Sequence, residues 1–247
     1  MSGKRFRWFL LLLLILSFLL ILFYPTPLEW FLRLLFPGEE VHIYQRVPGI
    51  ILVQQHLMLV LIATGLAFII GFPLGVFVTR SWGRDFLPAV SDVIALAQTF
   101  PPVAVLALAV PILGFGFRPT ILALFLYSIL PIVRNTIAGL EGIPSGVNEA
   151  ARGVGMNSWQ RLYLVELPLA SRVILAGLRI AVIINIGTAT AGSVIGAGGL
   201  GVPIVSGLVW NNPALILGGA IQAALLALIF DQLLGLIDST FLSRFEL

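Results

Sequence analysis

The sequence predicts an all-α integral membrane protein with about six transmembrane helices. Of the 247 residues, 59% are hydrophobic and only 10% are charged, and the mean hydropathy is +1.08. A soluble domain carries roughly a quarter charged residues, so this chain is too apolar to cover itself with a hydrated surface. Its apolar residues also fall into runs of roughly 20, the length that a helix needs to cross a bilayer. Soluble, fibrous and disordered classes are therefore excluded.

The first apolar run covers residues 6–24 and follows Lys4, Arg5 and Arg7, as a signal peptide would. The run is longer than the usual signal-peptide core of about 7–15 residues, and no small-residue cleavage site follows it. We therefore expect residues 1–50 to comprise an uncleaved transmembrane helix and an extracytoplasmic connector.

Five further apolar runs follow, and polar or basic residues separate them. Pro101, Pro102 and Pro111 interrupt the third run, and Pro131 lies inside the fourth. Such prolines indicate either simple kinks or movable elements that line a translocation path, since broken helices are tolerated where a cavity or a neighbouring helix satisfies the backbone. The five runs are residues 55–79, 86–115, 119–135, 173–195 and 213–237, and a cytoplasmic tail, 241–247, follows them.

The placement of basic residues predicts the orientation, because cytoplasmic loops carry an excess of lysine and arginine. With both termini in the cytoplasm, the extracytoplasmic segments carry only Arg33, Arg46 and Arg118. The cytoplasmic segments then carry Lys4, Arg5, Arg7, Arg80, Arg84, Arg134, Arg152, Arg161, Arg172 and Arg244. This bias accounts for the basic pI of about 9.8 without any nucleic-acid partner.

Several kinds of site are excluded by residues that the sequence lacks. Cysteine is absent, which removes thiolate metal sites and thiol nucleophiles. The two histidines, His42 and His56, are too few for most histidine-based metal centres. The single lysine, Lys4, has no glycine-rich loop before it, so the chain has no P-loop with which to hydrolyse ATP.

The longest polar stretch, residues 142–172, predicts two short helices on the cytoplasmic face. Ser145 can cap the first helix, and Gly153 and Gly155 allow a turn after it. Asn157 or Ser158 can then cap the second helix.

The second of these helices has an apolar face suited to docking a partner. Trp159, Leu162 and Tyr163 fall on one face at helical spacing. Pro168 is expected to end the helix and redirect the chain into the fifth span.

This stretch resembles the EAA loop of ABC-importer permeases. The resemblance implies a small, methionine-permease-like fold for residues 51–240, with a coupling helix that fits a cleft on a cytoplasmic ATPase subunit. Valine stands at one position where isoleucine is frequent in the family. The matching residues are Glu149, Ala150, Ala151, Gly155, Val165, Leu167 and Pro168.

Further segments resemble the osmoprotectant branch of that family, which implies glycine betaine, choline, carnitine or a related quaternary ammonium compound as the substrate. Two alternatives stay open: a permease for an amino acid such as methionine or another small solute, and a membrane scaffold that only recruits an ATPase. The segments are residues 98–103, 111–116, 130–136, 185–190 and 195–201.

The resemblance also implies the partners. The chain itself would hold no cofactor, and ATP and Mg would bind to two partner ATPase subunits. A second permease copy or a homologous permease would complete the membrane unit, and an extracytoplasmic binding protein would deliver the solute. Transport would proceed by alternating access across the bacterial inner membrane.

Polar residues inside spans are candidates for function, because burying them in a bilayer costs free energy. Asp92, Arg179 and Asp231 are expected to form structural ion pairs or to extend toward the cytoplasmic surface. The candidate lining of the translocation path is Gln98, Thr99, Asn185, Thr188 and Thr190.

The run Gly196–Gly201 fits the G-x-G-x-x-G pattern of dinucleotide-binding folds, but it lacks the strand and helix that give the pattern its meaning. A tight turn after the fifth span, at an outer gate, is the better interpretation. His56, with Gln54 and Gln55, is expected to anchor the second span at the outer membrane interface.

Overall fold

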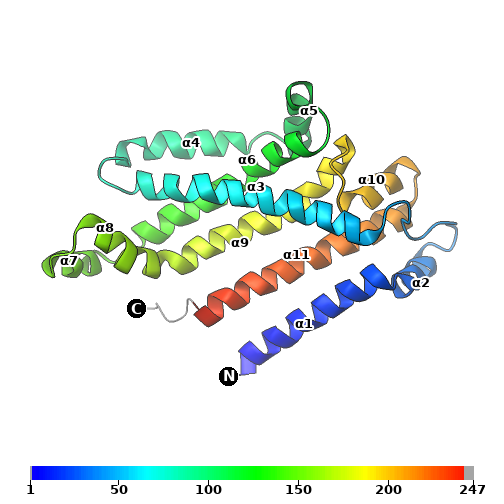
Figure 1. Cartoon of the computed structure of the whole chain (residues 1–247), viewed down its shortest axis with the longest axis horizontal. Coiled ribbons are helices and arrows are strands. Elements are labelled where there is room, and N and C mark those ends of the chain that lie inside the picture. Colours follow the sequence, from blue (N-terminus) through cyan, green and yellow to red (C-terminus); the bar gives the residue numbers. More distant parts are fainter. Residues whose placement is uncertain (1, 242–247) are drawn as a thin grey trace.

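The computed structural model describes residues 2–241, and every regular element in this range is helical (Figure 1). The predicted all-α fold is therefore confirmed. Of the predicted tail, 241–247, only the backbone of Phe241 belongs to the described residues. Five helices within this range are long and apolar enough to cross a membrane. They are α1 (Ser2–Phe23), α3 (Gly49–Val78), α6 (Phe117–Glu141), α9 (Leu167–Gly192) and α11 (Pro213–Phe241).

Shorter helices connect or flank these five. They are α2 (Thr26–Leu35), α4 (Leu87–Ala97), α5 (Pro102–Leu113), α7 (Ser145–Gly153), α8 (Ser158–Arg161) and α10 (Gly201–Val209). Two 3₁₀ turns, Arg84–Phe86 and Ser193–Ile195, and one π turn, Leu162–Glu166, complete the regular structure of the described residues.

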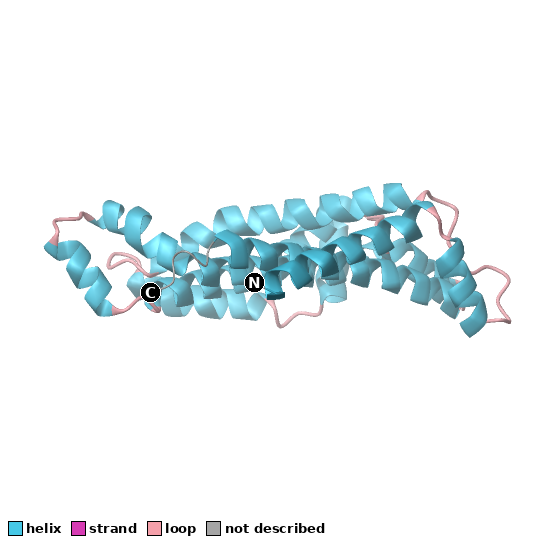
Figure 2. Ribbon diagram, turned by 90° about the horizontal axis from the view of Figure 1, so that it is seen from below, coloured by secondary structure: helices cyan, strands magenta, loops and turns pink. Residues whose placement is uncertain are grey.

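The long helices form an elongated bundle in which α6 packs between α3 and α9 (Figures 1 and 2). Glycines allow these close approaches, as is typical between membrane helices, which have no water to expel when they associate. A Cβ atom on Gly75 of α3 would lie 2.7 Å from Thr136 Cβ of α6. Next to this core, α11 packs against α9, and α1 covers α11 from the outside. The central three helices therefore form the most tightly joined part of the molecule.

The connecting elements divide between the two ends of the bundle (Figure 1). The α7–α8 pair projects at one end, and the start of α1 and the close of α11 lie toward that end. At the opposite end lie α2 and α10, where Leu28 and Leu32 of α2 pack against Ala214 of α11. The predicted connector before the second span therefore contains a helix and packs on the bundle.

The third predicted span, 86–115, differs most from the structure. It forms two helices, α4 and α5, that run in different directions and meet at residues 98–101 (Figure 1). Pro101 and Pro102 cause the break, because a proline disfavours helical geometry in the residue before it and lacks the N–H that would continue a helix. At 11 and 12 residues, each piece is shorter than the roughly 20 residues that a bilayer requires.

Candidate functional site

The polar stretch between α6 and α9 forms the α7–α8 pair that projects from one end of the bundle (Figure 2). The predicted cap by Ser145 is wrong, because Ser145 is the first helical residue and no side chain caps α7. Pro144 is extended, with φ −55° and ψ 137°, and the chain enters the helix directly after it. Ser145 therefore lies inside the helix and not ahead of it.

A glycine in the left-handed region bends the chain between α7 and α8. Gly155 has a φ of +84°, which residues with a Cβ atom rarely adopt. The N–H of Gly155 donates to Arg152 O over 2.9 Å, and the N–H of Met156 donates to Ala151 O over 3.1 Å. The space around Gly155 is open, so the requirement is for backbone conformation and not for room. The predicted turn is confirmed.

The residues of the EAA pattern lie on both sides of this bend. Glu149 and Ala150 are exposed on α7, whereas Ala151 is buried. Beyond the bend, Val165, Leu167 and Pro168 are half-buried. The exposed side of α7 is therefore free to meet another protein, and its small alanine side chain permits a close approach.

Asn157 caps α8 through a reciprocal pair of hydrogen bonds, as one of the two predicted caps. Asn157 Oδ1 accepts from the N–H groups of Trp159 and Gln160 at 3.0 and 2.9 Å, and Gln160 Oε1 accepts from the N–H of Asn157 at 2.9 Å. This capping box satisfies backbone donors that the start of a helix leaves free. It defines where α8 begins, although α8 itself is only one turn long.

A π turn follows α8 directly, and it corrects one prediction. Pro168 does not end the helix, because Ser158–Ile195 is one continuous helical run. The π turn widens the helix just ahead of Pro168, where an α-turn would place the proline ring against the preceding carbonyl. Leu162 is buried, while Trp159 and Tyr163 stack on the exposed side with ring centroids 6.0 Å apart. All three side chains line one apolar cavity against α3, so they share a face as predicted.

The sequence reasoning missed Glu166, which is the most buried charged residue of this region. Its side chain is 7% exposed, and both carboxylate oxygens are paired. Arg80 Nη1 lies 2.6 Å from Glu166 Oε2, and Arg161 Nε lies 2.9 Å from Glu166 Oε1. One sequence signal could have indicated this ion pair: Glu166 is the only acid in the otherwise apolar run from 162 to 169. A carboxylate buried among apolar residues requires a cationic partner.

Two cavities lie beside this ion triad. One, of about 710 Å³, is polar and lies among the ends of α3 and α6 and the α7–α8 pair. The other, of about 490 Å³, is apolar and is lined by aromatic side chains of α3 and α8 and of the π turn. Arg80, Trp82 and Ser158 line both cavities. Beside the cavities, Phe72 and Val76 of α3 pack against the apolar cluster of Leu140, Leu162, Ala170 and Ile174, so α3 meets the helical run through apolar contacts as well as through the ion pair.

The expected structural pairing of charges within the spans is confirmed for two of the three residues. Arg179 Nε of α9 donates to Asp231 Oδ1 of α11 over 2.6 Å. About two helical turns nearer the α7–α8 end, Arg172 Nε donates to Asp238 Oδ1 over 2.8 Å. Asp92 is exposed on α4 and takes no part in these pairs. Both links hold α9 to α11.

Two of the candidate path residues bond to other helices. Asn185 of α9 is fully buried, and its Nδ2 donates to Thr64 Oγ1 of α3 over 2.8 Å. Gln98, at the break between α4 and α5, donates through Nε2 to Tyr127 O of α6 over 2.6 Å.

The other three candidates have local environments. Thr99 and Thr190 bond to carbonyls of their own segments, Leu96 O and Gly187 O, and Thr188 is half-buried. The hydrogen bonds of the described residues therefore do not join the five candidates into one cluster. Their role along a path stays a prediction.

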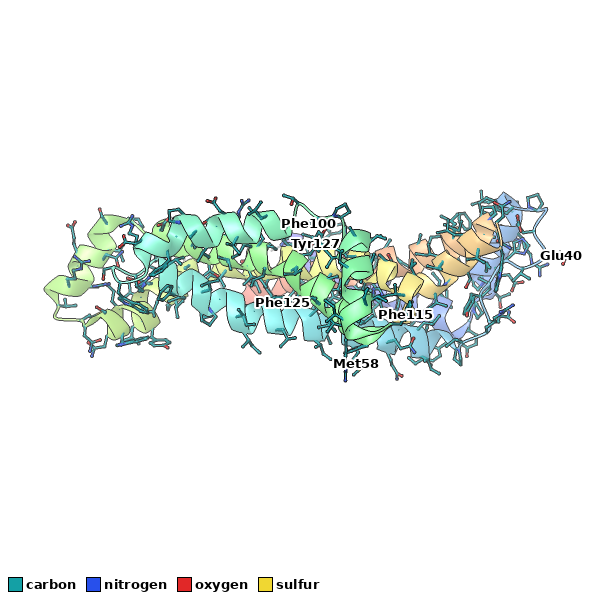
Figure 3. The ribbon with its side chains drawn as sticks, turned by 90° about the horizontal axis from the view of Figure 1, so that it is seen from above. Glu40, Met58, Phe100, Phe115, Phe125 and Tyr127 are labelled. Atoms are coloured by element: carbon teal, nitrogen blue, oxygen red, sulfur yellow. The ribbon has the colours of Figure 1, made fainter. Side chains whose placement is uncertain are left out.

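The break at residues 98–101 is tied to α6 from both directions. The Tyr127 hydroxyl donates to Phe100 O, while the Tyr127 carbonyl accepts from Gln98. Figure 3 shows Phe100 and Tyr127 next to each other, close to the start of α5. Phe115, at the other end of α5, is 79% exposed. Hydrogen bonds therefore hold the break between α4 and α5 in place against α6.

The glycine-rich run after α9 forms the expected tight turn. Gly196, Gly198 and Gly199 all have positive φ, between 79° and 85°. Gln55 Oε1 of α3 accepts from the N–H of Gly199 over 3.0 Å. The backbone exposed by the glycines thus bonds to α3.

His56 corrects a further prediction, because it does not anchor the helix at a membrane interface but is fully buried. Its Nε2 lies 3.0 Å from Ile186 O, and its Nδ1 accepts from the N–H of Leu200 over 3.3 Å. A carbonyl only accepts and an amide N–H only donates, so the ring is the neutral tautomer with hydrogen on Nε2. His56 therefore joins α3, α9 and the glycine turn.

The segment between α2 and α3 is fastened to the turn between α10 and α11. Asn212 Nδ2 donates to Val41 O over 2.8 Å, and the Arg46 guanidinium lies 4.3 Å from the Trp210 ring centroid. His42, which the sequence reasoning left without a role, is buried and bonds through Nε2 to Phe36 O. The N-terminal segment is thereby joined to the end of the bundle opposite the α7–α8 pair.

The family is decided by comparison with known proteins. Residues 67–243 match the family model described as binding-protein-dependent transport system inner membrane component. The chain belongs to this family. Its apolar helices and the family match together indicate a multi-pass protein of the inner membrane. The family match makes it the permease component of an ABC importer. Within residues 2–241, no group of three or more histidine, aspartate or glutamate side chains could hold a metal ion.

Similar proteins of this family are described as osmoprotectant permeases. The osmoprotectant import permease protein OsmY of Salmonella typhimurium is 48% identical over 198 residues, 80% of this chain and 84% of the relative. The glycine betaine/carnitine/choline transport system permease protein OpuCB of Bacillus subtilis is 44% identical over 184 residues, 74% of this chain and 84% of the relative.

Solved structures share the fold. The MetNI methionine ABC transporter in an inward-facing conformation aligns with a TM-score of 0.67 and 23% identity, covering 81% of this chain and 96% of that one. An amino acid ABC transporter with histidines aligns with a TM-score of 0.65, also at 23% identity, covering 77% and 92%. The expected small-permease fold is confirmed.

Proposed function

We propose that this permease subunit imports glycine betaine or a related quaternary ammonium osmoprotectant by alternating access. The observation that carries the proposal is the 48% identity to an osmoprotectant import permease over 80% of the chain. The Bacillus subtilis relative is named for glycine betaine, carnitine and choline, which share a trimethylammonium group. That shared group defines the substrate class proposed here.

The energy source lies on partner ATPase subunits, which bind ATP and Mg. Docking takes place on α7, where Glu149 and Ala150 are exposed and the left-handed Gly155 defines the angle to α8. Glu149 offers a carboxylate to a basic group of the partner. Movement of α7 reaches α8 across the bend at Gly155 and then passes into α9 without a further break, because α8, the π turn and α9 form one helical run. The loop 142–172 thereby couples ATP hydrolysis to the span.

The complete importer contains two permease subunits, two ATPase subunits and an extracytoplasmic binding protein. The permease pair is a homodimer or a heterodimer with a homologous permease. The α7–α8 end faces the cytoplasm, as the excess of basic residues there supports. The turn at Gly196–Gly201 and the segment fastened to Trp210 then face the binding protein.

The solute passes along the polar groups of the α4–α5 break and α9, which include Gln98, Thr99, Asn185, Thr188 and Thr190. A quaternary ammonium ion has no N–H to donate, so the path needs weak, non-specific contacts and not a tight site. High affinity for the cation belongs to the binding protein, where aromatic rings commonly hold such groups by cation–π attraction.

The test is uptake of radiolabelled glycine betaine by bacterial cells that lack their own osmoprotectant importers and express the complete complex. We expect saturable uptake at high osmolarity that unlabelled choline or carnitine reduces and methionine does not. Competition by methionine, with no effect of choline, would assign the chain to amino-acid import instead. Recruitment of the ATPase without uptake of any of these solutes would make the chain a scaffold.

A further inference from the structure

The two arginines that pair with Glu166 belong to different parts of the bundle. Arg161 and Glu166 lie on the continuous run from α8 through the π turn to α9, whereas Arg80 lies just beyond the end of α3. The N–H of Arg80 donates to Phe77 O over 3.0 Å, so the Arg80 backbone is bonded to the last turn of α3. The Arg80–Glu166 ion pair therefore links α3 to the helical run that carries the docking loop.

The surroundings make this pair the main polar connection between α3 and α8. Cavities of about 710 and 490 Å³ lie on either side of it, and both are lined by Arg80, Trp82 and Ser158. Apolar contacts of Phe72 and Val76 with the cluster around Leu162 lie next to it, so the ion pair is the polar part of this junction. A force applied to α8 reaches the end of α3 through charged atoms that are in direct contact, at 2.6 Å.

The burial of the triad favours a defined geometry over a loose one. The side chains of Arg80, Arg161 and Glu166 are 16%, 14% and 7% exposed. Charges so far removed from water are strongly disfavoured unless their partners stay in place, so the three groups resist separation. An exposed pair of the same length would exchange with water at little cost. The Arg80–Glu166 pair is therefore suited to transmitting movement between α3 and the helical run.

The far end of α3 gives such movement a consequence. Gln55 and His56 of α3 hold the N–H groups of Gly199 and Leu200 in the glycine turn. Midway along the two helices, Asn185 of α9 bonds to Thr64 of α3. Polar links thus join α3 to α9 and its turn at three depths of the membrane.

We propose that Glu166 is a positioning residue whose ion pair with Arg80 makes α3 follow the docking loop when the partner ATPases close. The inference rests on the proposed function, since it needs an importer driven through this loop. Without the pair, the loop would still move α9 directly, but the end of α3 at Arg80 would follow only through its apolar contacts and less completely. ATP would then be hydrolysed with less solute transported for each ATP.

A matched pair of substitutions tests the proposal. Arg80→Gln removes the arm to α3 and leaves Glu166 paired with Arg161, whereas Arg161→Gln removes the arm within the helical run and leaves Glu166 paired with Arg80. Both keep one buried ion pair, so both perturb the local charge to a similar extent. Asp238→Asn, which alters the separate α9–α11 pair with Arg172, serves as a second control.

The measurement is the number of glycine betaine molecules transported per ATP by the purified complex in proteoliposomes. We expect Arg80→Gln to lower this ratio about five-fold, a size typical of residues that transmit coupling without touching ligand. Arg161→Gln and Asp238→Asn should leave the ratio near wild type, and Arg80→Lys should restore part of it. Equal losses in both arginine variants, or no loss in Arg80→Gln, would overturn the proposal.

A second measurement decides the matter if Arg80→Gln does not assemble. The chain has no cysteine, so Ser81→Cys and Ser158→Cys allow spin labels to be placed only at the end of α3 and the start of α8. In complexes diluted with unlabelled permease, the distance between the labels should be the same without nucleotide and with trapped ATP. A change of that distance would contradict joint movement. Wild-type complex that transports no solute would instead overturn the proposed function.

Discussion

Asn185 Nδ2 donates to Thr64 Oγ1 over 2.8 Å at a fully enclosed contact between α9 and α3, and Asn185 Oδ1 has no partner among the described residues. The two side chains differ in how well they tolerate separation. A helical threonine can return its hydroxyl to a carbonyl of its own helix, whereas an asparagine amide leaves two N–H groups to satisfy. The contact is therefore asymmetric.

This asymmetry predicts that two substitutions at the contact change stability to different extents. Thr64→Val should lower the free energy of unfolding by about 1 kcal/mol, because it leaves the buried Asn185 amide unpaired. Asn185→Leu should be nearly neutral, since it removes the amide and its unpaired oxygen together. Unfolding in mixed micelles titrated with denaturing detergent measures both. If Asn185→Leu proved the more harmful of the two, the hydrogen bond would not be the cause.

Asn185→Leu also tests the predicted path. A path-lining role requires uptake of glycine betaine to fall while stability and ATP hydrolysis stay near wild type. Unchanged uptake would confine Asn185 to the helix contact with Thr64.

The bend at Gly155 predicts a graded effect on coupling. Gly155→Ala forces a Cβ into a left-handed conformation at a cost of about 1–2 kcal/mol, so the angle between α7 and α8 should relax and less solute should be transported per ATP. Gly155→Asn should be milder, since asparagine tolerates this conformation better. Transport and hydrolysis by the complete complex give the ratio. Equal ratios for glycine and alanine would remove the bend from the coupling mechanism.

Breaking the Arg179–Asp231 ion pair should destabilise the protein, and replacing both charges with apolar side chains should restore most of the stability. Asp231→Asn should destabilise the protein by about 2 kcal/mol, below the roughly 3–5 kcal/mol of fully buried pairs because the side chains are 36% and 25% exposed. The double variant Arg179→Leu/Asp231→Leu should recover most of the loss. Thermal unfolding of the solubilised protein compares them. A double variant less stable than Asp231→Asn would show that the charges themselves hold α9 to α11.

The contact between Gln55 and the glycine turn predicts a change in accessibility. Gln55→Leu leaves the N–H of Gly199 without its acceptor, so the turn should open more often. Gln55→Glu keeps an acceptor oxygen at an exposed position and should behave like wild type. The labelling rate of Ala197→Cys by a hydrophilic maleimide reports opening, because the chain has no other cysteine. Identical rates in all three backgrounds would contradict a restraining role for Gln55.

Local patterns predicted the helices and the loop because their causes are local. Hydropathy located the long spans, and Asn157 and Gly155 marked a cap and a bend through chemistry confined to a few residues. Pro101 and Pro102 also indicated the break in the third span, although the sequence did not predict that the span divides into two separate helices, α4 and α5.

Tertiary contacts explain what the sequence could not predict. Arg80 and Glu166 are 86 residues apart, and His56 and Leu200 are 144 apart, so no spacing rule connects them. The π turn follows from accommodating Pro168 inside a helix that packing keeps continuous. A window of sequence around Pro168 shows only the proline, and so predicts an end to the helix.

The central claim is that ATP hydrolysed on partner subunits drives import of a quaternary ammonium solute through this chain by way of the loop 142–172. The most direct measurement is ATP-dependent uptake of radiolabelled glycine betaine by proteoliposomes that contain the purified complex and its binding protein. Wild-type complex should accumulate the solute, and a Gly155→Ala complex should hydrolyse ATP with little accumulation. Accumulation without ATP, or equal accumulation by both complexes, would contradict the account.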